Sequence, residues 1–473
     1  MTDSPIHFVL DGDTSVQADG SDPTRTALDL LREHLGRTGV KEGCAEGDCG
    51  ACTILLGELD GERVAWRAVN SCILFAPMLD GKAVLTVESL AEGGTLHPVQ
   101  RALADGHGSQ CGFCTPGFAM SLYGRSIGAE GTRDTPVADV IAGNLCRCTG
   151  YGPILEAGER NPPAGCDDRK TAALLRDLPR AASGRGWFAP QTADALAALY
   201  AAHPDARIVA GATDVGLWVT KAMRDLGTVI FIGDIADLKG IEESAEGLRL
   251  GAGVRYTEAK EALARLHPDL GELVRRIGGL QVRNSGTIGG NIANGSPIGD
   301  MPPALIALGA ALTLRQGDAR RTIPLEAWFK SYGVQDRRPG EFVESVWIPR
   351  PAPDALIRIA KLSKRFDSDI SALCGAFALR IADGRVAAAR VAFGGMAGIP
   401  ARAPACEAAL TGQPWSAATV EAAAAALARD YQPLSDLRGS AEYRLAAAAN
   451  LLRRLWHEAQ GERVSVLDMA LDG

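Results

Sequence analysis

Eight of the eleven cysteines in this sequence fall into two groups of four within its first third. The first group reads C-x4-C-x2-C, with a fourth cysteine after nineteen more residues: Cys44, Cys49, Cys52 and Cys72. The second reads C-x2-C and, after thirty-one residues, C-x-C: Cys111, Cys114, Cys146 and Cys148. Four thiolates provide two ligands for each iron of a [2Fe–2S] cluster, and the first spacing is the plant-type ferredoxin pattern. Two such groups in tandem predict a relay for single electrons.

Two other uses of cysteine compete with iron–sulfur clusters. Disulfides need an oxidising compartment, and the sequence opens without the basic and apolar segments of a secretion signal, so a reducing cytoplasm is expected. Structural zinc prefers C-x2–4-C pairs separated by a longer span, which the second group alone would satisfy. The first group fits zinc less well, because three of its cysteines crowd into nine residues among glycines. The remaining three, Cys166, Cys374 and Cys406, are expected to be buried free thiols.

The composition limits the size and the partners of the protein. A chain of 473 residues should hold three or four domains. The net charge of −8 argues against nucleic acid as a partner, and no Lys/Arg stripe with interleaved aromatic residues offsets that charge. No run reaches about eighteen apolar residues, so no membrane-spanning segment is expected.

Local patterns predict strands around one helix, then a helical region. Strands are expected at 6–13, 53–56 and 83–87, and a helix at 27–34 that is started by Asp22-Pro23-Thr24. From 97 to about 157 the pattern turns helical, with Pro116 in the first turn of a helix directly after Cys114. The first region suits a small β-grasp unit and the second a helical bundle. Alanine-rich helices are expected at 415–430 and 441–455.

Two later segments are rich in small residues. Residues 207–216 read as a strand, a turn and the start of a helix, an arrangement that brings backbone N–H groups to a phosphate but also occurs as an ordinary βα turn. Residues 286–300 contain many glycines and few bulky side chains, which few packing requirements demand but a close-fitting pyrophosphate does. Neither segment is G-x-G-x-x-G or a P-loop. Asp300 is expected to cap the following helix. Two anion-binding loops downstream of one-electron clusters suggest a flavin.

These motifs resemble those of the iron–sulfur/flavin subunits of bacterial xanthine dehydrogenases, within the molybdenum hydroxylase family. The resemblance covers essentially the whole chain. Its carriers are residues 41–53, 110–117 and 143–151, the two glycine loops, the segment 361–370 and the tail 433–438. The cysteine motifs alone are shared by aldehyde oxidases, carbon monoxide dehydrogenases and nicotinate-type hydroxylases. The animal enzymes carry an arginine pair where this sequence has Arg365-Phe366, so their oxidase switching is not implied here.

The resemblance implies an α+β multidomain fold in five parts. These are a β-grasp 2Fe-2S ferredoxin-like domain (1–90), a helical-bundle 2Fe-2S domain (91–160), a linker (161–186), a two-part α+β FAD-binding domain (187–350) and a C-terminal α+β flavoprotein domain (351–473). It also implies the residues that contact FAD: Ile208, Val209, Ala210, Gly211, Ala212, Thr213, Asp214, Val215, Ile277, Thr287, Ile288, Gly289, Gly290, Asn291, Asp300, Val343 and Lys361. No catalytic residue is assigned.

The resemblance further implies a complete electron path. A partner subunit that binds molybdopterin would oxidise hypoxanthine or xanthine to urate, in an α2β2 assembly. Electrons would then pass through the two 2Fe-2S clusters to FAD and on to NAD+. The second cysteine group would lie nearer the molybdenum and the first nearer the flavin. The alternative is the same relay in an aldehyde-, nicotinate- or CO-type molybdenum hydroxylase.

Overall fold

The computed structural model describes residues 5–464, which divide into two compact units. Of the described residues, unit 1 contains 5–239, Arg255–Glu258 and Gly278–Gly290, and unit 2 contains Gly240–Val254, Ala259–Ile277 and 291–464. The chain therefore leaves unit 1 after Lys239 and later returns to it twice. No helix within residues 5–464 is long and apolar enough to cross a membrane.

Unit 1 begins with a five-stranded sheet in the order β2-β1-β5-β3-β4. The strands are β1 (Ile6–Leu10), β2 (Thr14–Ala18), β3 (Thr53–Asp60), β4 (Arg63–Asn70) and β5 (Ala83–Leu85). β1 and β5 are parallel, and the other pairs are antiparallel. The predicted helix is present as α1 (Ala27–Asp29) and a π-helical turn, Leu30–His34. It spans the predicted 27–34, but Thr26 rather than Asp22 caps its first turn, by accepting a hydrogen bond from Asp29 N.

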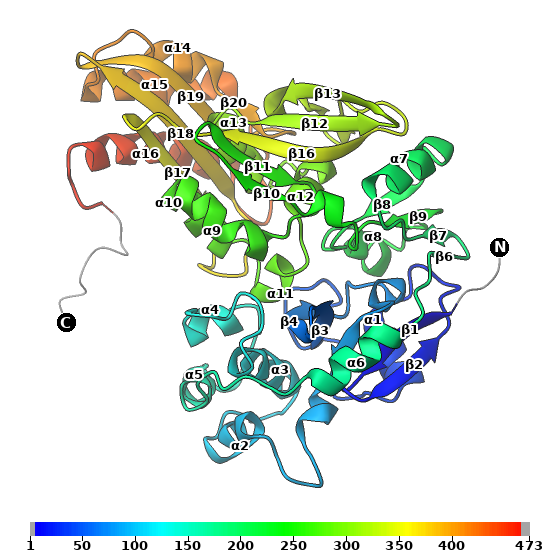
Figure 1. The fold of residues 1–473 in the computed structure, drawn as a ribbon. Coiled ribbons are helices and arrows are strands. Elements are labelled where there is room, and N and C mark those ends of the chain that lie inside the picture. Colours follow the sequence, from blue (N-terminus) through cyan, green and yellow to red (C-terminus); the bar gives the residue numbers. More distant parts are fainter. Residues whose placement is uncertain (1–4, 465–473) are drawn as a thin grey trace. The chain divides into compact units, whose positions relative to one another are not determined.

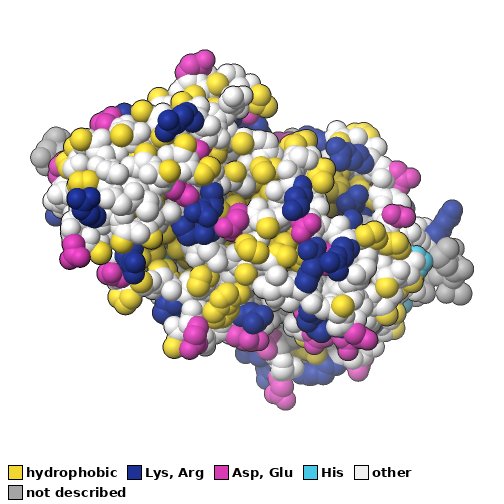
Figure 2. All heavy atoms as spheres, turned by 90° about the horizontal axis from the view of Figure 1, so that it is seen from above, with side chains coloured by type: hydrophobic (Ala, Val, Ile, Leu, Met, Phe, Trp, Pro, Cys, Tyr) yellow, Lys and Arg dark blue, Asp and Glu magenta, His cyan; other side chains and the backbone are white. Residues whose placement is uncertain are grey.

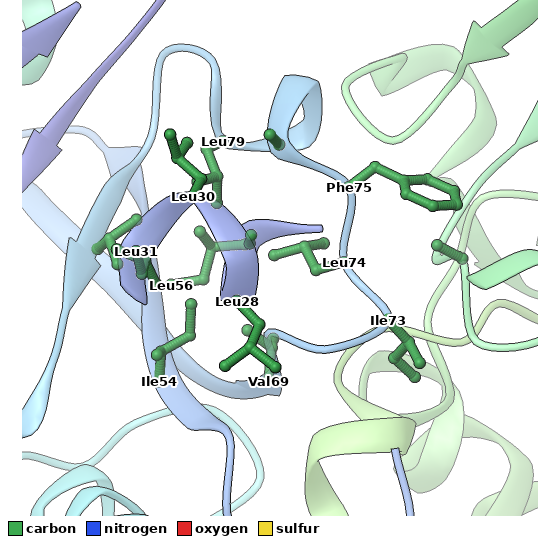
Figure 3. Packing of buried hydrophobic residues seen from close by; sticks show 14 of the residues in the cluster. Leu28, Leu30, Leu31, Ile54, Leu56, Val69, Ile73, Leu74, Phe75 and Leu79 are labelled. Atoms are coloured by element: carbon green, nitrogen blue, oxygen red, sulfur yellow. The ribbon is translucent and has the colours of Figure 1, made fainter. Parts of the chain in front are cut away.

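An apolar core joins this helix to the sheet. Figure 3 shows Leu28 and Leu31 beside Ile54 and Val69 in this core. Burial of such side chains contributes about 1.5–3 kcal/mol each. Cys52 and Cys72 belong to the same core, so apolar packing brings these two thiols to one end of the β3–β4 hairpin.

Four helices follow the sheet and form a second core against it (Figure 1). They are α2 (Pro98–Asp105), α3 (Thr115–Ser126), α4 (Val137–Ile141) and α5 (Gly152–Glu159). The stretch expected as a linker contains α6 (Arg169–Asp177), whose Ala172 and Leu175 are buried in this second core. Asp168 anchors the start of α6 by accepting from Val64 N at 3.1 Å.

The rest of unit 1 is a four-stranded sheet with its helices. The sheet runs β6-β7-β9-β8, with β7, β9 and β8 parallel. Its elements are β6 (Ser183–Gly184), β7 (Trp187–Phe188), α7 (Ala193–Ala202), β8 (Arg207–Val209), α8 (Val215–Thr220) and β9 (Val229–Phe231). The second return segment adds α11 (Leu280–Arg283), and α12 (Ile288–Asn294) begins in it. Short 3-10 turns occur at Ala76–Leu79, Val87–Leu90 and Ala236–Leu238.

Unit 2 contains two larger antiparallel sheets and a hairpin. The first sheet runs β10-β11-β16-β12-β13, with β10 (Ile241–Glu243), β11 (Gly247–Gly251), β12 (Ala311–Gln316), β13 (Ala319–Pro324) and β16 (Phe342–Pro349). The second runs β17-β18-β19-β20, with β17 (Ala355–Leu362), β18 (Leu373–Ala382), β19 (Arg385–Gly394) and β20 (Ala401–Arg402). The hairpin is β14 (Phe329–Ser331) and β15 (Val334–Gln335), preceded by a 3-10 turn at Leu325–Ala327.

The helices of unit 2 are α9 (Tyr256–Leu266, which begins in unit 1), α10 (Pro268–Arg275), α13 (Met301–Ala307), α14 (Pro404–Leu410), α15 (Ala417–Asp430) and α16 (Ala441–Ala459). The last two confirm the predicted alanine-rich helices, and their apolar faces share one core with β18 and β19. The expected α+β fold class is confirmed. On the face shown in Figure 2, Lys and Arg side chains are interspersed with Asp and Glu.

Candidate cofactor sites

The first cysteine group lies in a loop that turns backbone N–H groups toward sulfur. The N–H groups of Glu46 and Cys49 donate to Cys44 Sγ at 3.5 and 3.4 Å. The loop needs left-handed backbone at Gly47 and Gly50, with φ of +76° and +69°. Such donors stabilise negative charge on cluster sulfurs.

The four thiols of this group contact one another. Cys44 is hydrogen-bonded to Cys49 and Cys72, and Cys52 to Cys72. The bonds from Cys44 raise the pKa of Cys49 and of Cys72 and, in turn, lower that of Cys44. Within residues 5–464, no set of three or more His, Cys, Asp or Glu side chains forms a site for a single metal ion. The structure thus brings the four predicted ligands together in one connected chain of contacts.

The second cysteine group is arranged as two pairs, and it lies nearer the surface. Cys111 is hydrogen-bonded to Cys148, and Cys114 to Cys146. Burial, followed by the bond with Cys146, raises the pKa of Cys114 to about 12. Cys111 and Cys148 are exposed. Two pairs of thiolates match the two irons of a [2Fe–2S] cluster.

Local hydrogen bonds position this second group. Cys146 Sγ lies 3.2 Å from Thr149 Oγ1, and Cys146 N donates to the Tyr151 hydroxyl at 3.0 Å. Cys114 is the residue before α3, and Pro116 lies in the first turn, as predicted. The helix thus presents the thiol of Cys114 at its N-terminal end.

The three remaining cysteines differ from expectation at one position. Cys374 and Cys406 are buried free thiols, as predicted. Cys166 is only half-buried, so the expectation of burial is wrong there. It lies in the loop before α6, where its carbonyl accepts from Arg63 Nη2 at 2.7 Å at the surface.

The two small-residue segments meet within unit 1. A Cβ on Gly211 would lie 1.7 Å from the Ser285 carbonyl oxygen, and one on Gly286 would lie 3.3 Å from Thr213 Oγ1. The backbones of the two loops therefore touch, and only glycine fits at position 211. This contact places Ile208–Val215 beside the segment that leads into Thr287–Gly290.

The start of α12 keeps open space at Gly290. Thr287 Oγ1 accepts from Gly290 N at 3.0 Å, which caps the helix. A Cβ on Gly290 would meet only this hydroxyl, at 2.7 Å, and the residue is exposed. Its φ lies outside the left-handed region, so a substitution there is opposed by this contact and not by backbone strain.

The predicted FAD residues of unit 2 include a buried ion pair. Lys361 Nζ donates to Asp300 Oδ2 at 2.7 Å, and Ser371 Oγ donates to the other carboxylate oxygen at 2.5 Å. Asp300 lies at the N-cap position of α13, but its side chain does not cap the helix, which corrects the expectation. The physical reason is that an N-cap oxygen accepts from the second or third helical N–H, and Pro302 and Pro303 have none.

Arg276 and Ser371 are polar contacts of this region that the sequence reading missed. Lys361 Nζ donates to the Arg276 carbonyl at 3.0 Å. The Arg276 guanidinium donates to the carbonyls of Lys361 (2.9 Å) and Phe366 (2.8 Å) and lies 4.3 Å from the Phe366 ring centroid. Arg276 precedes the predicted contact Ile277, and that adjacency was the available signal. These bonds hold the start of segment 361–370.

Two further predicted FAD contacts are Val343, which is apolar, and Asn291, which is polar. Val343 is buried in β16 and pairs with Leu314 of β12. Asn291 has a buried Oδ1 that accepts no hydrogen bond. Because buried polar atoms are normally satisfied, this oxygen fits a residue that awaits a donor from a bound group. Predicted FAD contacts therefore occur in both units: Ile208–Val215 and Thr287–Gly290 in unit 1, and Ile277, Asn291, Asp300, Val343 and Lys361 in unit 2.

Four family profiles match successive parts of the chain. Residues 9–76 match a 2Fe-2S iron-sulfur cluster binding domain and 86–159 a [2Fe-2S] binding domain. Residues 181–351 match the FAD binding domain in molybdopterin dehydrogenase, and 358–459 the CO dehydrogenase flavoprotein C-terminal domain. The chain has the iron–sulfur and flavin domains of the molybdenum hydroxylase family. Two 2Fe-2S domains and an FAD-binding domain are thus present.

Xanthine dehydrogenases are similar to this chain over nearly its whole length. The xanthine dehydrogenase of Emericella nidulans is 30% identical over 528 residues, which cover 96% of this chain and 39% of that protein. The xanthine dehydrogenase of Drosophila subobscura is 33% identical, covering 95% of this chain and 39% of that protein. This chain therefore spans about two fifths of the length of these relatives.

Solved structures of the family match a smaller part of the chain. A chain of the carbon monoxide dehydrogenase from Hydrogenophaga pseudoflava is 29% identical with a TM-score of 0.55, covering 58% of this chain and 96% of that one. A chain of quinoline 2-oxidoreductase from Pseudomonas putida 86 is 26% identical with a TM-score of 0.54, covering 58% of this chain and 97% of that one.

Proposed function

We propose that this chain is the electron-transfer subunit of a xanthine dehydrogenase, an oxidoreductase of the molybdenum hydroxylase family. A partner subunit with molybdopterin oxidises hypoxanthine or xanthine to urate, and this chain carries the electrons through two 2Fe-2S clusters to FAD and then to NAD+. The proposal includes an α2β2 assembly, a cytoplasmic location and the predicted division at residues 90, 160, 186 and 350.

The observation that carries this proposal is coverage. The xanthine dehydrogenases named above match 95–96% of this chain. The solved chains of the carbon monoxide and quinoline enzymes match 58% of it, and these matches cover 96–97% of the solved chains. Cluster domains and flavin domains on one polypeptide therefore favour the xanthine dehydrogenase arrangement. The profile over 358–459, which is named for a CO dehydrogenase flavoprotein, favours the alternative of a CO-, aldehyde- or nicotinate-type hydroxylase.

The residues of this chain have distinct proposed roles. Each cysteine group holds one cluster, which supplies one-electron chemistry. The touching loops around Gly211 and Thr287 would hold the pyrophosphate, and Asn291 Oδ1 offers an unused acceptor. FAD, when bound, accepts electrons one at a time and can pass two of them on as a hydride. Lys361 is held at a fixed place by Asp300, so its ammonium is a positioned donor.

The test separates the two half-reactions. The purified chain should oxidise NADH with an artificial acceptor, because flavin and clusters suffice for that reaction. It should oxidise xanthine only after the molybdenum subunit is added. Xanthine oxidation by the isolated chain would contradict the two-subunit scheme. Reconstitution with carbon monoxide, an aldehyde or nicotinate as substrate, and not xanthine, would support the alternative.

A further inference from the structure

A buried cluster of polar side chains in unit 1 joins β3, α3, the loop before Cys146 and α11. Its members, here called the amide junction, are Thr53, Ser121, Asn144 and Gln281, none more than 2% exposed. The Gln281 Nε2 donates to Asn144 Oδ1 at 3.0 Å and to Thr53 Oγ1 at 3.1 Å. It also lies 3.3 Å from Ser121 Oγ as a donor. Gln281 Oε1 is buried and accepts no hydrogen bond, so the junction depends on the bonds that Nε2 donates, and breaking them leaves further buried polar atoms unpaired.

Three of the four members of the amide junction lie close in sequence to a predicted cofactor site. Thr53 directly follows Cys52 of the first cysteine group. Asn144 is two residues before Cys146 of the second group. Gln281 lies in α11, a few residues before Ser285, whose carbonyl touches Gly211. One side chain, that of Gln281, therefore contacts both cluster domains from the segment that leads into the flavin loop.

The amide junction surrounds a direct backbone contact between the two cysteine groups. Leu145 N donates to the Cys49 carbonyl at 2.9 Å, and Asn144 Nδ2 donates to the Gly50 carbonyl at 3.0 Å. The fit is close: a Cβ on Gly143 would lie 2.1 Å from Gln281 Oε1, and one on Gly50 would lie 2.2 Å from the Gly143 carbonyl oxygen. Packing and hydrogen bonds thus hold this contact together.

We propose that Gln281 is a positioning residue for electron transfer, which fixes the coupling between the two cysteine groups by holding the Leu145–Cys49 hydrogen bond closed. The inference rests on the proposed function, in which each group carries a cluster. One electron leaves one group, which is oxidised, and arrives at the other, which is reduced, and no bond forms or breaks. Such transfer slows steeply with separation and is favoured by covalent and hydrogen-bonded paths. From Cys49 to Cys146 the path needs one hydrogen bond and the backbone of Leu145.

The test compares Gln281→Met with Leu280→Met in the full chain. Leu280 lies beside Gln281 in α11 but is buried in an apolar core, so its exchange for Met removes no polar contact. In Gln281→Met the iron content and the separate EPR signals of the two reduced clusters should match wild type. The magnetic splitting between the clusters in the fully reduced protein should be lost, and one electron should equilibrate between them severalfold more slowly. Leu280→Met should behave as wild type throughout.

A milder variant covers the case in which Gln281→Met does not fold. Ser121→Ala removes one acceptor of Gln281 and the hydroxyl that donates to Asn144 Oδ1 at 2.7 Å, but it leaves Gln281 its bonds to Thr53 and Asn144, so a smaller change in the same direction is expected. Unchanged splitting and rate in every folded variant of the junction would overturn the inference.

Phe113 provides a competing contact between the groups. A Cβ built on Gly43 would lie 3.4 Å from Phe113 Cε1 and 2.8 Å from Cys49 Sγ, so the Phe113 ring lies beside the first cysteine group. Loss of splitting in Phe113→Leu, with none in Gln281→Met, would also overturn the inference.

Failure of the proposed function would look different. A chain without two clusters would fail metal analysis, whereas the amide junction can be tested without metal by hydrogen exchange at Leu145 N–H. Protection of this N–H should fall in Gln281→Met and persist in Leu280→Met. Equal exchange in both variants and wild type would overturn the inference, whatever the cluster content.

Discussion

Each cysteine group brings its four thiols together, but the two groups differ in their surroundings. In the first group, Cys52 and Cys72 are part of an apolar core, and backbone N–H groups point at Cys44. In the second, Cys111 and Cys148 are exposed. Reduction adds negative charge to a cluster, so solvent exposure and N–H donors both change its potential. The difference teaches that one chain can place two four-cysteine groups in surroundings of different polarity and accessibility.

The largest expected effect comes from removing single ligands. The wild-type chain should contain about four irons and four sulfides, as two [2Fe–2S] centres require. Cys49→Ser should remove one reduced-cluster EPR signal and Cys114→Ser the other, each with about half of the iron. Cys406→Ser, at a buried cysteine outside both groups, is the matched control. Zinc in the metal analysis, or a single cluster in the wild type, would contradict the comparison itself.

The flavin site should respond independently of both cysteine groups. Gly290→Val should give protein with wild-type iron and little FAD, because the side chain would fill the open space beside Thr287. Gly398→Val is a fair control, since Gly398 is also exposed and its Cβ would meet only Tyr332 Cβ at 3.7 Å. The FAD-to-iron ratio is the measurement. A wild-type ratio in Gly290→Val would assign the loop a structural role and direct the search to Gly211–Asp214.

Exposure should make the second group more labile. A water-soluble iron chelator, added to the isolated chain, should abolish the EPR signal that depends on Cys114 severalfold faster than the signal that depends on Cys49. The reason is that the chelator can reach Cys111 and Cys148 directly, whereas Cys52 and Cys72 are 1% and 2% exposed. Equal rates would mean that exposed thiols do not govern cluster loss here.

The smallest expected effect concerns the sheet that carries the first group. Burial opposes ionisation of Glu58, but Lys82 and Arg67 outweigh it and hold the pKa of Glu58 well below its usual range. A lowered pKa gives stability that is present above the ordinary value of 4.5 and is lost as the pH falls through the folded-state pKa. Glu58→Gln should therefore lower the free energy of unfolding by about 1–3 kcal/mol at neutral pH. The loss stays in this range because the Glu58 side chain is not fully buried.

That stability difference should shrink in acid, where wild-type Glu58 also becomes neutral. The exposed pair of Glu421 with Arg453 is the control, and Glu421→Gln should leave the free energy of unfolding nearly unchanged. Denaturant unfolding at neutral and acid pH measures both variants. A difference for Glu58→Gln that persists unchanged in acid would show that lost packing, not lost charge, is responsible.

Short-range features of this molecule could be predicted from its sequence. Cys44, Cys49 and Cys52 come together because a glycine-containing loop of nine residues must bring them together. The strand at Thr53 and the helix near Ala27 follow from local apolar patterns. The role of Asp300 was misjudged although the signal, two prolines in the next helix, was present.

Long-range features could not be predicted in this way. Gln281 lies 137 residues from Asn144 and 228 residues from Thr53 in sequence. No local pattern distinguishes a glutamine that will be buried among hydroxyl groups from one on a helix surface. The same holds for Ser371, which joins Asp300 across 71 residues. Such contacts depend on packing of whole segments, which periodicity does not describe.

The return of Gly278–Gly290 to unit 1 has a consequence for the order of assembly during synthesis. Both cysteine groups are complete once Cys148 has been made, whereas Gln281 is made more than a hundred residues later. The nascent chain therefore passes through a period in which every cluster ligand exists and the amide junction does not. Because domains tend to fold as they emerge, metal can be loaded into the two domains when only their shared core and the backbone contact between the cysteine groups join them, before Gln281 is made. A cut after Lys239 would leave unit 1 permanently in that unfastened condition.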